Sequence, residues 1–315
     1  MKYKFLNKSN FKIWSKLGMR ASFGLAALEV IKEIDNLMIL TSDVSTSAGL
    51  DRFRKQYPEN YIDVGIAEQN LLGVAAGLSS EGFNTVTTTF SPFQTLRCCE
   101  QIKVNLGYMK HKVVMVGLAS GLVLGNLGYT HCSIEDIGVL RSIPNLKIIC
   151  PADPAEAIKS FVSSLFESKS VYIRLTGGSN MSQIYEDDYE FGIGKSITLK
   201  KGDDITIFAN GTMVKTALDV SILLDKDQIS TEVVNMHTVK PIDKNKIVEV
   251  AKKKKLVISL EEHNIIGGLG SSVAEVLSGI EKSPKHILVG INDEYSEGGD
   301  YKYLINKFKL DKESI

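Results

Sequence analysis

Glu68 is a single carboxylate that stands between a short apolar segment and a run of small residues. The apolar segment, residues 63–67, alternates too little for a solvated strand and is typical of a buried one. The glycines and alanines at 73–77 permit close packing of a helix directly behind it. A carboxyl group in that setting is poorly solvated and can share a proton with a ligand nitrogen. The alternative is an ordinary first-turn glutamate favoured by the helix dipole, and this stretch alone does not separate the two.

Two aromatic residues, a histidine and a second acid could serve the same site. Phe90 and Phe93 would share a face on a helical turn, and core packing is the default for such a pair. His131 follows a glycine-rich loop in which backbone can approach a ligand closely. A lone histidine is more often structural, but an imidazole can also donate to an oxygen and carry a proton near neutral pH. Asp43 follows a predicted strand and could face a site or cap the next turn.

The composition indicates a globular protein with no charge bias. The chain has 315 residues, 43% of them hydrophobic, and this length favours two domains. Its formal net charge is zero, so there is no electrostatic argument for nucleic acid as a partner. No segment reaches the roughly 18 apolar residues needed to span a bilayer, so we expect no contact with a membrane. No pair of cysteines has the C-x-x-C spacing of a zinc site, and a reduced, cytoplasmic compartment fits best; the cysteines are Cys98, Cys99, Cys132 and Cys150.

Strand and helix patterns alternate along the chain, which predicts an α/β fold with a mainly parallel sheet covered on both faces. In the first domain the predicted strands are 37–41, 61–64, 84–88, 113–117, 147–150 and 171–175, and the predicted helices are 20–34, 69–80, 93–107, 134–141 and 154–168. A smaller α/β series follows, with strands at 205–209, 231–235 and 254–260 and a helix at 270–278. We therefore expect an N-terminal arm at 1–15, a first domain at 16–180, a linker at 181–202 and a second domain at 203–315.

Several short motifs occur in a specific order. They are Gly-Ile-Ala-Glu-Gln-Asn at 65–70, Thr-Phe-Ser-Pro-Phe at 89–93, Gly-Tyr-Thr-His at 128–131, Arg-Ser-Ile-Pro-Asn at 141–145 and Val-Lys-Pro-Ile-Asp at 239–243. In order and spacing the chain resembles the C-terminal half of transketolase, the thiamine diphosphate enzyme that moves two-carbon ketol units between sugars. The resemblance runs from about residue 19 to residue 277 and implies a pyrimidine-binding domain followed by a transketolase C-terminal domain.

The resemblance assigns a cofactor role to four residues. In the family, the residue matching Glu68 bonds the ring nitrogen of the aminopyrimidine and favours its imino tautomer. Phe93 matches an aromatic that stacks against the pyrimidine, with Phe90 as a supporting wall. Asp43 matches an acid that faces the site. These matches predict that this chain binds the pyrimidine half of thiamine diphosphate.

Substrate contacts are implied in the same way. The residue matching His131 lies beside the carbonyl and hydroxyls of the donor sugar, where it polarises the substrate and transfers a proton. Arg20, Ser47 and Arg174 match positions that bind the substrate phosphate, and two guanidiniums with a hydroxyl suit an anionic oxygen cluster. The expected substrate is therefore a phosphorylated or modified sugar.

Three positions depart from the family pattern. Ala119 stands where a substrate-binding histidine is usual, Leu127 where an aspartate reads a sugar hydroxyl, and Cys132 where a glutamine is usual. Each change removes a polar contact, and a site without a partner for a buried hydroxyl disfavours substrates that carry it. The hypothesis is that donor or acceptor differs from the sugars of central metabolism.

The motif that binds the diphosphate in this family, Gly-Asp-Gly followed by an asparagine, has no clear match. Residues 202–204 read Gly-Asp-Asp and lack the second glycine. Hard cations that bridge phosphates need oxygen ligands and usually a helix N-terminus, so we expect no metal ligands in this chain. The interpretation is that a separate N-terminal-type subunit brings Mg²⁺ or another divalent cation. The assembly would be a dimer of such heterodimers, active only when both subunits are present.

Three other functions remain open at this point. A deoxyxylulose phosphate synthase shares the Gly-Ile-Ala-Glu-Gln and Thr-His motifs, and the β subunit of a 2-oxo acid dehydrogenase shares the architecture and the glutamate. A non-catalytic relative that kept the fold is the third alternative. Retention of Glu68, Phe93 and His131 together favours an enzyme.

Overall fold

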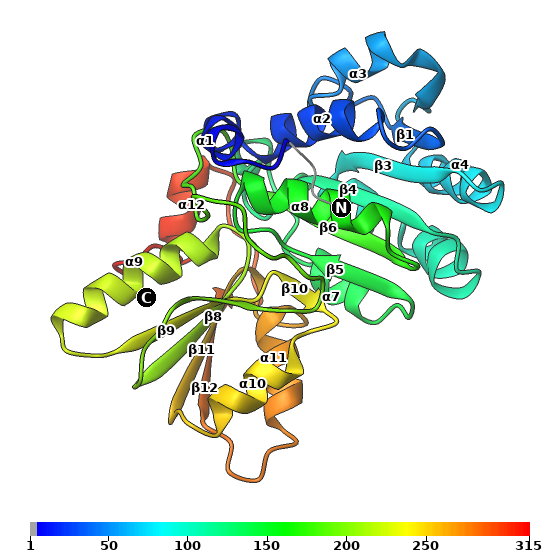
Figure 1. The fold of residues 1–315 in the computed structure, drawn as a ribbon. Coiled ribbons are helices and arrows are strands. Elements are labelled where there is room, and N and C mark those ends of the chain that lie inside the picture. Colours follow the sequence, from blue (N-terminus) through cyan, green and yellow to red (C-terminus); the bar gives the residue numbers. More distant parts are fainter. Residues whose placement is uncertain (1–4) are drawn as a thin grey trace.

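Two mainly parallel sheets form the framework of the computed structural model, which describes residues 5–315 (Figure 1). The larger sheet contains β1 (Leu37–Thr41), β2 (Tyr61–Asp63), β3 (Asn84–Phe90), β4 (Val113–Ser120), β5 (Leu146–Ile149), β6 (Ser170–Thr176) and β10 (Thr238–Lys240). Its strand order is β10-β5-β6-β4-β3-β1-β2, and only the β10–β5 pair is antiparallel. The predicted α/β class and mainly parallel sheet are confirmed.

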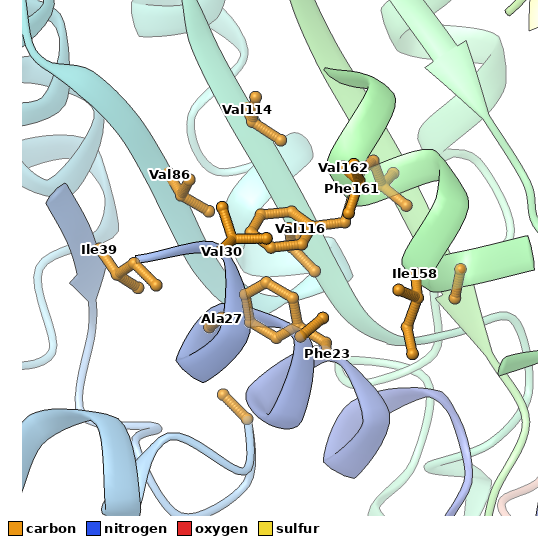
Figure 2. Packing of buried hydrophobic residues seen from close by; sticks show 14 of the residues in the cluster. Phe23, Ala27, Val30, Ile39, Val86, Val114, Val116, Ile158, Phe161 and Val162 are labelled. Carbon is orange, nitrogen blue, oxygen red and sulfur yellow. The ribbon is translucent and has the colours of Figure 1, made fainter. Parts of the chain in front are cut away.

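Helices cover both faces of this sheet because its strands are apolar on both sides. One face is covered by α1 (Lys8–Leu17), α2 (Met19–Val30), α3 (Asp51–Gln56) and α8 (Pro154–Leu165), and the other by α4 (Glu68–Ser80), the π-helix η2 (Ile102–Tyr108) and α7 (Asp136–Arg141). Figure 2 shows the first of these cores, where residues of α2 and α8 pack on β1, β3 and β4. The rings of Phe23 and Phe161 meet edge to face there, with centroids 5.0 Å apart.

The smaller sheet contains β7 (Ile197–Lys200), β8 (Ile205–Ala209), β9 (Thr231–Asn235), β11 (Leu256–Asn264) and β12 (Lys285–Ile291), in the order β12-β11-β8-β9-β7. On one side lie α9 (Met213–Lys226) and α12 (Tyr301–Lys307), and on the other α10 (Lys244–Ala251) and α11 (Leu269–Leu277). Within residues 5–315, no helix is both long enough and apolar enough to cross a membrane.

Three predictions about chain organisation are corrected. The segment at 181–202 is not all linker, because it contains β7, the antiparallel edge strand beside β9. This strand is short and only half-buried, so its apolar pattern is weak. In addition, β10 comes after β9 in the chain yet pairs with β5, so the second half of the chain supplies a strand to the first sheet. The helix expected at 93–107 is divided into α5 (Ser91–Thr95), α6 (Cys99–Gln101) and η2.

The strand order creates a switch point at the carboxyl ends of β1 and β3. From β1 the chain crosses through α3 to β2 on one side, and then through α4 to β3 on the other side. Phe53 of α3 and Leu71 of α4 belong to the cores on opposite faces of the sheet, so the two crossovers lie on opposite faces. In open α/β sheets, ligands bind at such a point, outside the carboxyl ends of the strands.

Arg174 of β6 joins the two halves of the molecule. Arg174 is 1% exposed, and its Nε donates to the Asp136 carboxylate at 2.9 Å. Its Nη2 donates to the carbonyl oxygens of Ser133 at 2.7 Å and of Glu262, on β11, at 3.0 Å. Burial alone would lower the pKa of Arg174, but the charge of Asp136 raises it above its usual value. The prediction that Arg174 binds a substrate phosphate does not fit, because the guanidinium is enclosed and already paired.

Glu262 makes a second link across the same boundary. Its Oε1 accepts from the Leu122 backbone N–H at 2.8 Å, and its Oε2 accepts from Thr212 Oγ1 at 2.7 Å and the Tyr301 hydroxyl at 2.6 Å. The neighbouring Glu261 accepts from the first backbone N–H groups of α11. These acids therefore hold the second domain together and against the first.

We predict that Arg174→Met lowers the free energy of unfolding by about 3–5 kcal/mol, because it leaves the Asp136 carboxylate buried without a cation. Urea unfolding of the purified chain measures this value. Arg174→Met combined with Asp136→Leu should recover much of the loss, whereas Arg52→Met, the same substitution at an exposed position of α3, should have no effect. Unchanged stability together with weaker substrate binding in Arg174→Met would restore the phosphate-binding interpretation.

Candidate active site

Glu68 is the first residue of α4 and lies at the switch-point edge of the larger sheet. The loop before it is fixed by Ser42, whose hydroxyl donates to the Gly65 carbonyl at 2.5 Å and accepts from the Ala67 N–H at 3.0 Å. Gly65 has a φ of +72°, a conformation that favours glycine. Glu68 is 4% exposed, so its carboxylate is largely removed from water, as the sequence predicted.

Asp63, which sequence reasoning did not single out, organises this loop. Its Oδ1 accepts from the N–H groups of Asp43 at 3.0 Å and Gly65 at 2.9 Å, and its Oδ2 accepts from Thr41 Oγ1 at 2.9 Å. Burial opposes ionisation, but these hydrogen bonds hold the pKa of Asp63 below its usual value. A charged Asp63 thus ties the end of β1 to the segment that leads to Glu68.

An aromatic group lies beside the carboxylate. Phe90 ends β3 and Phe93 is in α5, and their ring centroids are 6.3 Å apart in an edge-to-face arrangement. The His131 ring lies 5.2 Å from the Phe93 centroid and 6.5 Å from the Phe90 centroid. Both phenylalanines and the histidine are partly exposed, so they line an accessible surface, and Phe90 also packs against the first core.

His131 is placed by a loop that the second domain supports. Gly128 has a φ of +86°, and its carbonyl accepts from the His131 N–H at 3.0 Å to close the turn. The same loop is held from the other side, because the Gly299 N–H donates to the Gly125 carbonyl at 3.0 Å. His131 Nδ1 lies 3.1 Å from Thr130 Oγ1, which leaves Nε2 for a ligand.

Arg97 is a site residue that sequence reasoning missed. Its Nη1 donates to Glu68 Oε2 at 2.8 Å, and its Cζ lies 4.1 Å from the centroid of the Phe93 ring. The spacing gives a usable signal, since residues four apart meet on a helical turn and Arg97 follows Phe93 by four positions. The prediction that a helix continues through residues 93–107 could have led to this pair.

Asp43 lies on the same edge, directly after β1. Its backbone is in the left-handed region, with a φ of +55°, and its side chain is exposed. The hydrogen bonds of Ser42 place this turn against the loop that precedes Glu68. A strained, exposed acid at a switch point is compatible with the predicted contact to a ligand.

Arg20 and Ser47 come together in a separate hollow of about 270 Å³. They are brought there by close packing of the Ser47 loop on α2, where a Cβ at Gly24 would lie 2.1 Å from the Gly49 carbonyl oxygen. Thr46, Gly178 and Ser179 also line the hollow. Desolvation lowers the pKa of the half-buried Arg20, which forms no ion pair within residues 5–315. Such a cation is available to an anion.

The positions that depart from the family pattern are placed differently from one another. Ala119 is completely buried with a φ of +51°, and Cys132 is also buried. Leu127 is 54% exposed, in the loop that carries His131. Only Leu127 is therefore in a position to contact a ligand directly.

Three large apolar residues near the site in sequence are exposed. Ile66, Leu96 and Leu127, which flank the site residues along the chain, are 79%, 40% and 54% exposed. These side chains leave apolar surface open to contact with another molecule. Within residues 5–315, no cluster of three or more His, Cys, Asp or Glu is arranged to hold a metal ion.

Known families match nearly the whole chain. The model of the transketolase pyrimidine-binding domain matches residues 15–180, and that of the transketolase C-terminal domain matches residues 194–315. A protein of Methanocaldococcus jannaschii named putative transketolase C-terminal section is 38% identical, covering 95% of this chain and 94% of its own. A 6-deoxy-6-sulfo-D-fructose transketolase subunit from Clostridium sp. (strain MSTE9) is 37% identical, covering 91% of this chain and 89% of its own.

A solved structure agrees with these matches. It is described as a split-gene transketolase, an inactive β4 tetramer, and it superimposes with a TM-score of 0.86 at 36% identity. The alignment covers 95% of both chains, so the two-domain arrangement is shared throughout. By sequence and by fold, the chain belongs to the transketolase family, whose members are transferases that depend on thiamine diphosphate.

Proposed function

We propose that this chain is the C-terminal subunit of a split transketolase and holds the pyrimidine side of thiamine diphosphate together with the ketose substrate. The observation that carries this proposal is the convergence of Glu68, Phe93 and His131 at the switch point of the sheet. Relatives that are named as a transketolase section or subunit over almost their whole length support it.

The residues present fit the pyrimidine. A flat guanidinium with N–H donors lies over the Phe93 ring and on the Glu68 carboxylate, which supports a slot suited to a planar cation. A protonated aminopyrimidine has the same flat shape and the same kind of donor. Phe90 would form the wall behind Phe93, and Asp43 would face the ligand from the end of β1.

Each residue then has a distinct task. When bound, thiamine diphosphate supplies the nucleophilic carbon and the electron sink for ketol transfer. Glu68 would accept a hydrogen bond from a protonated ring nitrogen, because its carboxylate has little water around it and needs a donor. His131 donates to the carbonyl oxygen or hydroxyl of the sugar through Nε2 and moves a proton at that atom.

The active enzyme would need a second subunit. An N-terminal-type subunit would cover the exposed Ile66, Leu96 and Leu127 and bring the diphosphate and Mg²⁺ sites. The solved split-gene relative is an inactive tetramer of β chains, which supports the same dependence on a partner here. The complete assembly would be a dimer of heterodimers, and the free thiols of Cys98, Cys132 and Cys150 fit a reducing cytoplasm.

The substrate would be a ketose with a terminal oxyanion. Arg20 and Ser47 offer a cation and a hydroxyl in one hollow, a combination that suits phosphate or sulfonate oxygens. One relative is named for 6-deoxy-6-sulfo-D-fructose, a sugar that carries such a group. The apolar Leu127 favours a sugar that lacks a hydroxyl at the position it faces.

We predict that the chain mixed with its partner subunit binds thiamine diphosphate in the presence of Mg²⁺, and that Glu68→Gln weakens binding roughly 10- to 100-fold because a charge-assisted hydrogen bond is lost. Titration calorimetry measures both values. Glu59→Gln, at an exposed position, is the matched control and should bind normally. Equally tight binding by this chain alone would contradict the need for a partner.

His131→Asn should lower kcat of ketol transfer by roughly 10²- to 10⁴-fold and leave cofactor affinity unchanged, because it removes proton transfer to the substrate. Steady-state kinetics of the assembled enzyme give kcat, and calorimetry gives the affinity. His111→Asn, outside the site, serves as the control. An equal loss of cofactor affinity in His131→Asn would assign that residue to the cofactor instead.

Arg20→Met should raise KM for an anionic ketose by roughly 10- to 100-fold with little change in kcat, since it removes contacts to an unreactive end of the substrate. Comparing a 6-phospho, a 6-sulfo and an unsubstituted ketose separates this effect from a general loss. The unsubstituted sugar should show the same KM in the variant and in the unmodified enzyme. An equal increase in KM for all three sugars would show that the hollow does not bind the anionic group.

A decarboxylating synthase remains the alternative reaction class. Such an enzyme releases CO₂ from a 2-oxo acid donor, whereas ketol transfer between sugars releases none. Incubating the assembled enzyme with pyruvate and an aldose phosphate, and measuring CO₂, distinguishes the two. CO₂ release without ketol transfer would replace the proposed function with the synthase.

A further inference from the structure

Arg97 makes both contacts that the proposed function gives to the pyrimidine. Its Nη1 lies 2.8 Å from Glu68 Oε2, and its Cζ lies 4.1 Å from the Phe93 centroid. The Phe90 and His131 rings also lie edge to face with Phe93, with centroids 6.3 Å and 5.2 Å away. A guanidinium and a pyrimidine ring cannot occupy one ring face and one carboxylate oxygen at the same time.

The chemistry of the guanidinium explains why an arginine fits. It is planar, permanently charged, stacks on aromatic faces and donates N–H groups within its plane. A protonated aminopyrimidine shares each of these properties. Lysine would keep the charge but lose the flat stacking surface.

The environment of Glu68 supplies the reason for the contact. Its side chain is 5% exposed, and a carboxylate removed from water is strongly destabilising unless a cation or hydrogen-bond donor accompanies it. Arg97 provides that partner. Its own side chain is 45% exposed, so it can leave the carboxylate and enter solvent without repacking the core.

The backbone at Arg97 is held while its side chain is free to move. The Gln69 side chain donates to the Arg97 carbonyl at 3.1 Å, and the Arg97 N–H donates to the Pro92 carbonyl at 3.3 Å. The Cys98 thiol is anchored to the Phe93 carbonyl. A change of side-chain rotamer is therefore the simplest way to exchange Arg97 for a ligand.

We propose that Arg97 is a positioning residue that occupies the pyrimidine slot of the cofactor-free protein, holds the Glu68 carboxylate in place through their ion pair, and is displaced when the cofactor binds. This inference rests on the proposed function. It makes the arginine a competitor of the cofactor, so removing it should tighten binding.

The test is calorimetric titration of thiamine diphosphate, with Mg²⁺, into the complex of this chain with its partner subunit. Arg97→Met should tighten binding about fivefold, which corresponds to about 1 kcal/mol, the scale of a partly exposed ion pair. The affinity of Arg97→Lys for the cofactor should lie between those of Arg97→Met and the unmodified complex. Arg52→Met, the same substitution on α3, should have the affinity of the unmodified complex. The advantage of Arg97→Met should shrink as salt rises, because salt screens the competing pair.

Unchanged or weaker binding by Arg97→Met, with normal binding by the unmodified complex, overturns this inference alone. Failure of the unmodified complex to bind the cofactor overturns the proposed function and this inference with it.

A measurement without the cofactor tests separately whether Arg97 stabilises the Glu68 carboxylate. In urea unfolding of the chain, Arg97→Met should raise the equilibrium constant for unfolding about fivefold and have little effect when Glu68→Gln is also present. Equal effects in both backgrounds would show that Arg97 does not serve the Glu68 carboxylate, which also overturns the inference.

Discussion

A carboxylate that is almost fully withdrawn from water needs a partner, and this requirement at Glu68 explains much of the surrounding structure. Asp63 and Ser42 fix the turn that delivers Glu68 to the edge of the sheet. Phe93 forms an apolar wall beside it, and Arg97 satisfies its charge in the protein alone. A ligand that replaces Arg97 must present a flat face and an N–H donor. Under the proposed function, the protonated pyrimidine of the cofactor meets both requirements.

The second domain contributes to this site without lining it. Arg174 and Glu262 connect the domains through buried hydrogen bonds, and the Gly299 N–H holds the loop that carries His131. The position of the imidazole beside Phe93 thus depends on contacts made far along the chain. Weakening these contacts between the domains would displace His131 before it affected Glu68, because the loop that carries Glu68 is held by elements of the first sheet.

Sequence patterns predicted most of the strands because parallel strands with two covered faces read as continuous apolar runs, and β1 (37–41) is the clearest case. Motif resemblance predicted Glu68, Phe90, Phe93 and His131, which the fold brings together. The resemblance also assigned Arg174 to a substrate phosphate, which does not fit the structure. The direction of a side chain on a buried strand depends on strand register, and the partner of Arg174 is Asp136, which another element supplies. The edge strands β7 and β10 were missed because short edge strands carry little apolar periodicity.

The most direct test of this account is a structure of the assembled enzyme with thiamine diphosphate bound. The account predicts that the pyrimidine ring nitrogen lies within hydrogen-bond distance of the Glu68 carboxylate, roughly 2.6–3.2 Å, with the ring on Phe93 and the Arg97 guanidinium moved away. A cofactor bound elsewhere, or bound while Arg97 still pairs with Glu68, would contradict it.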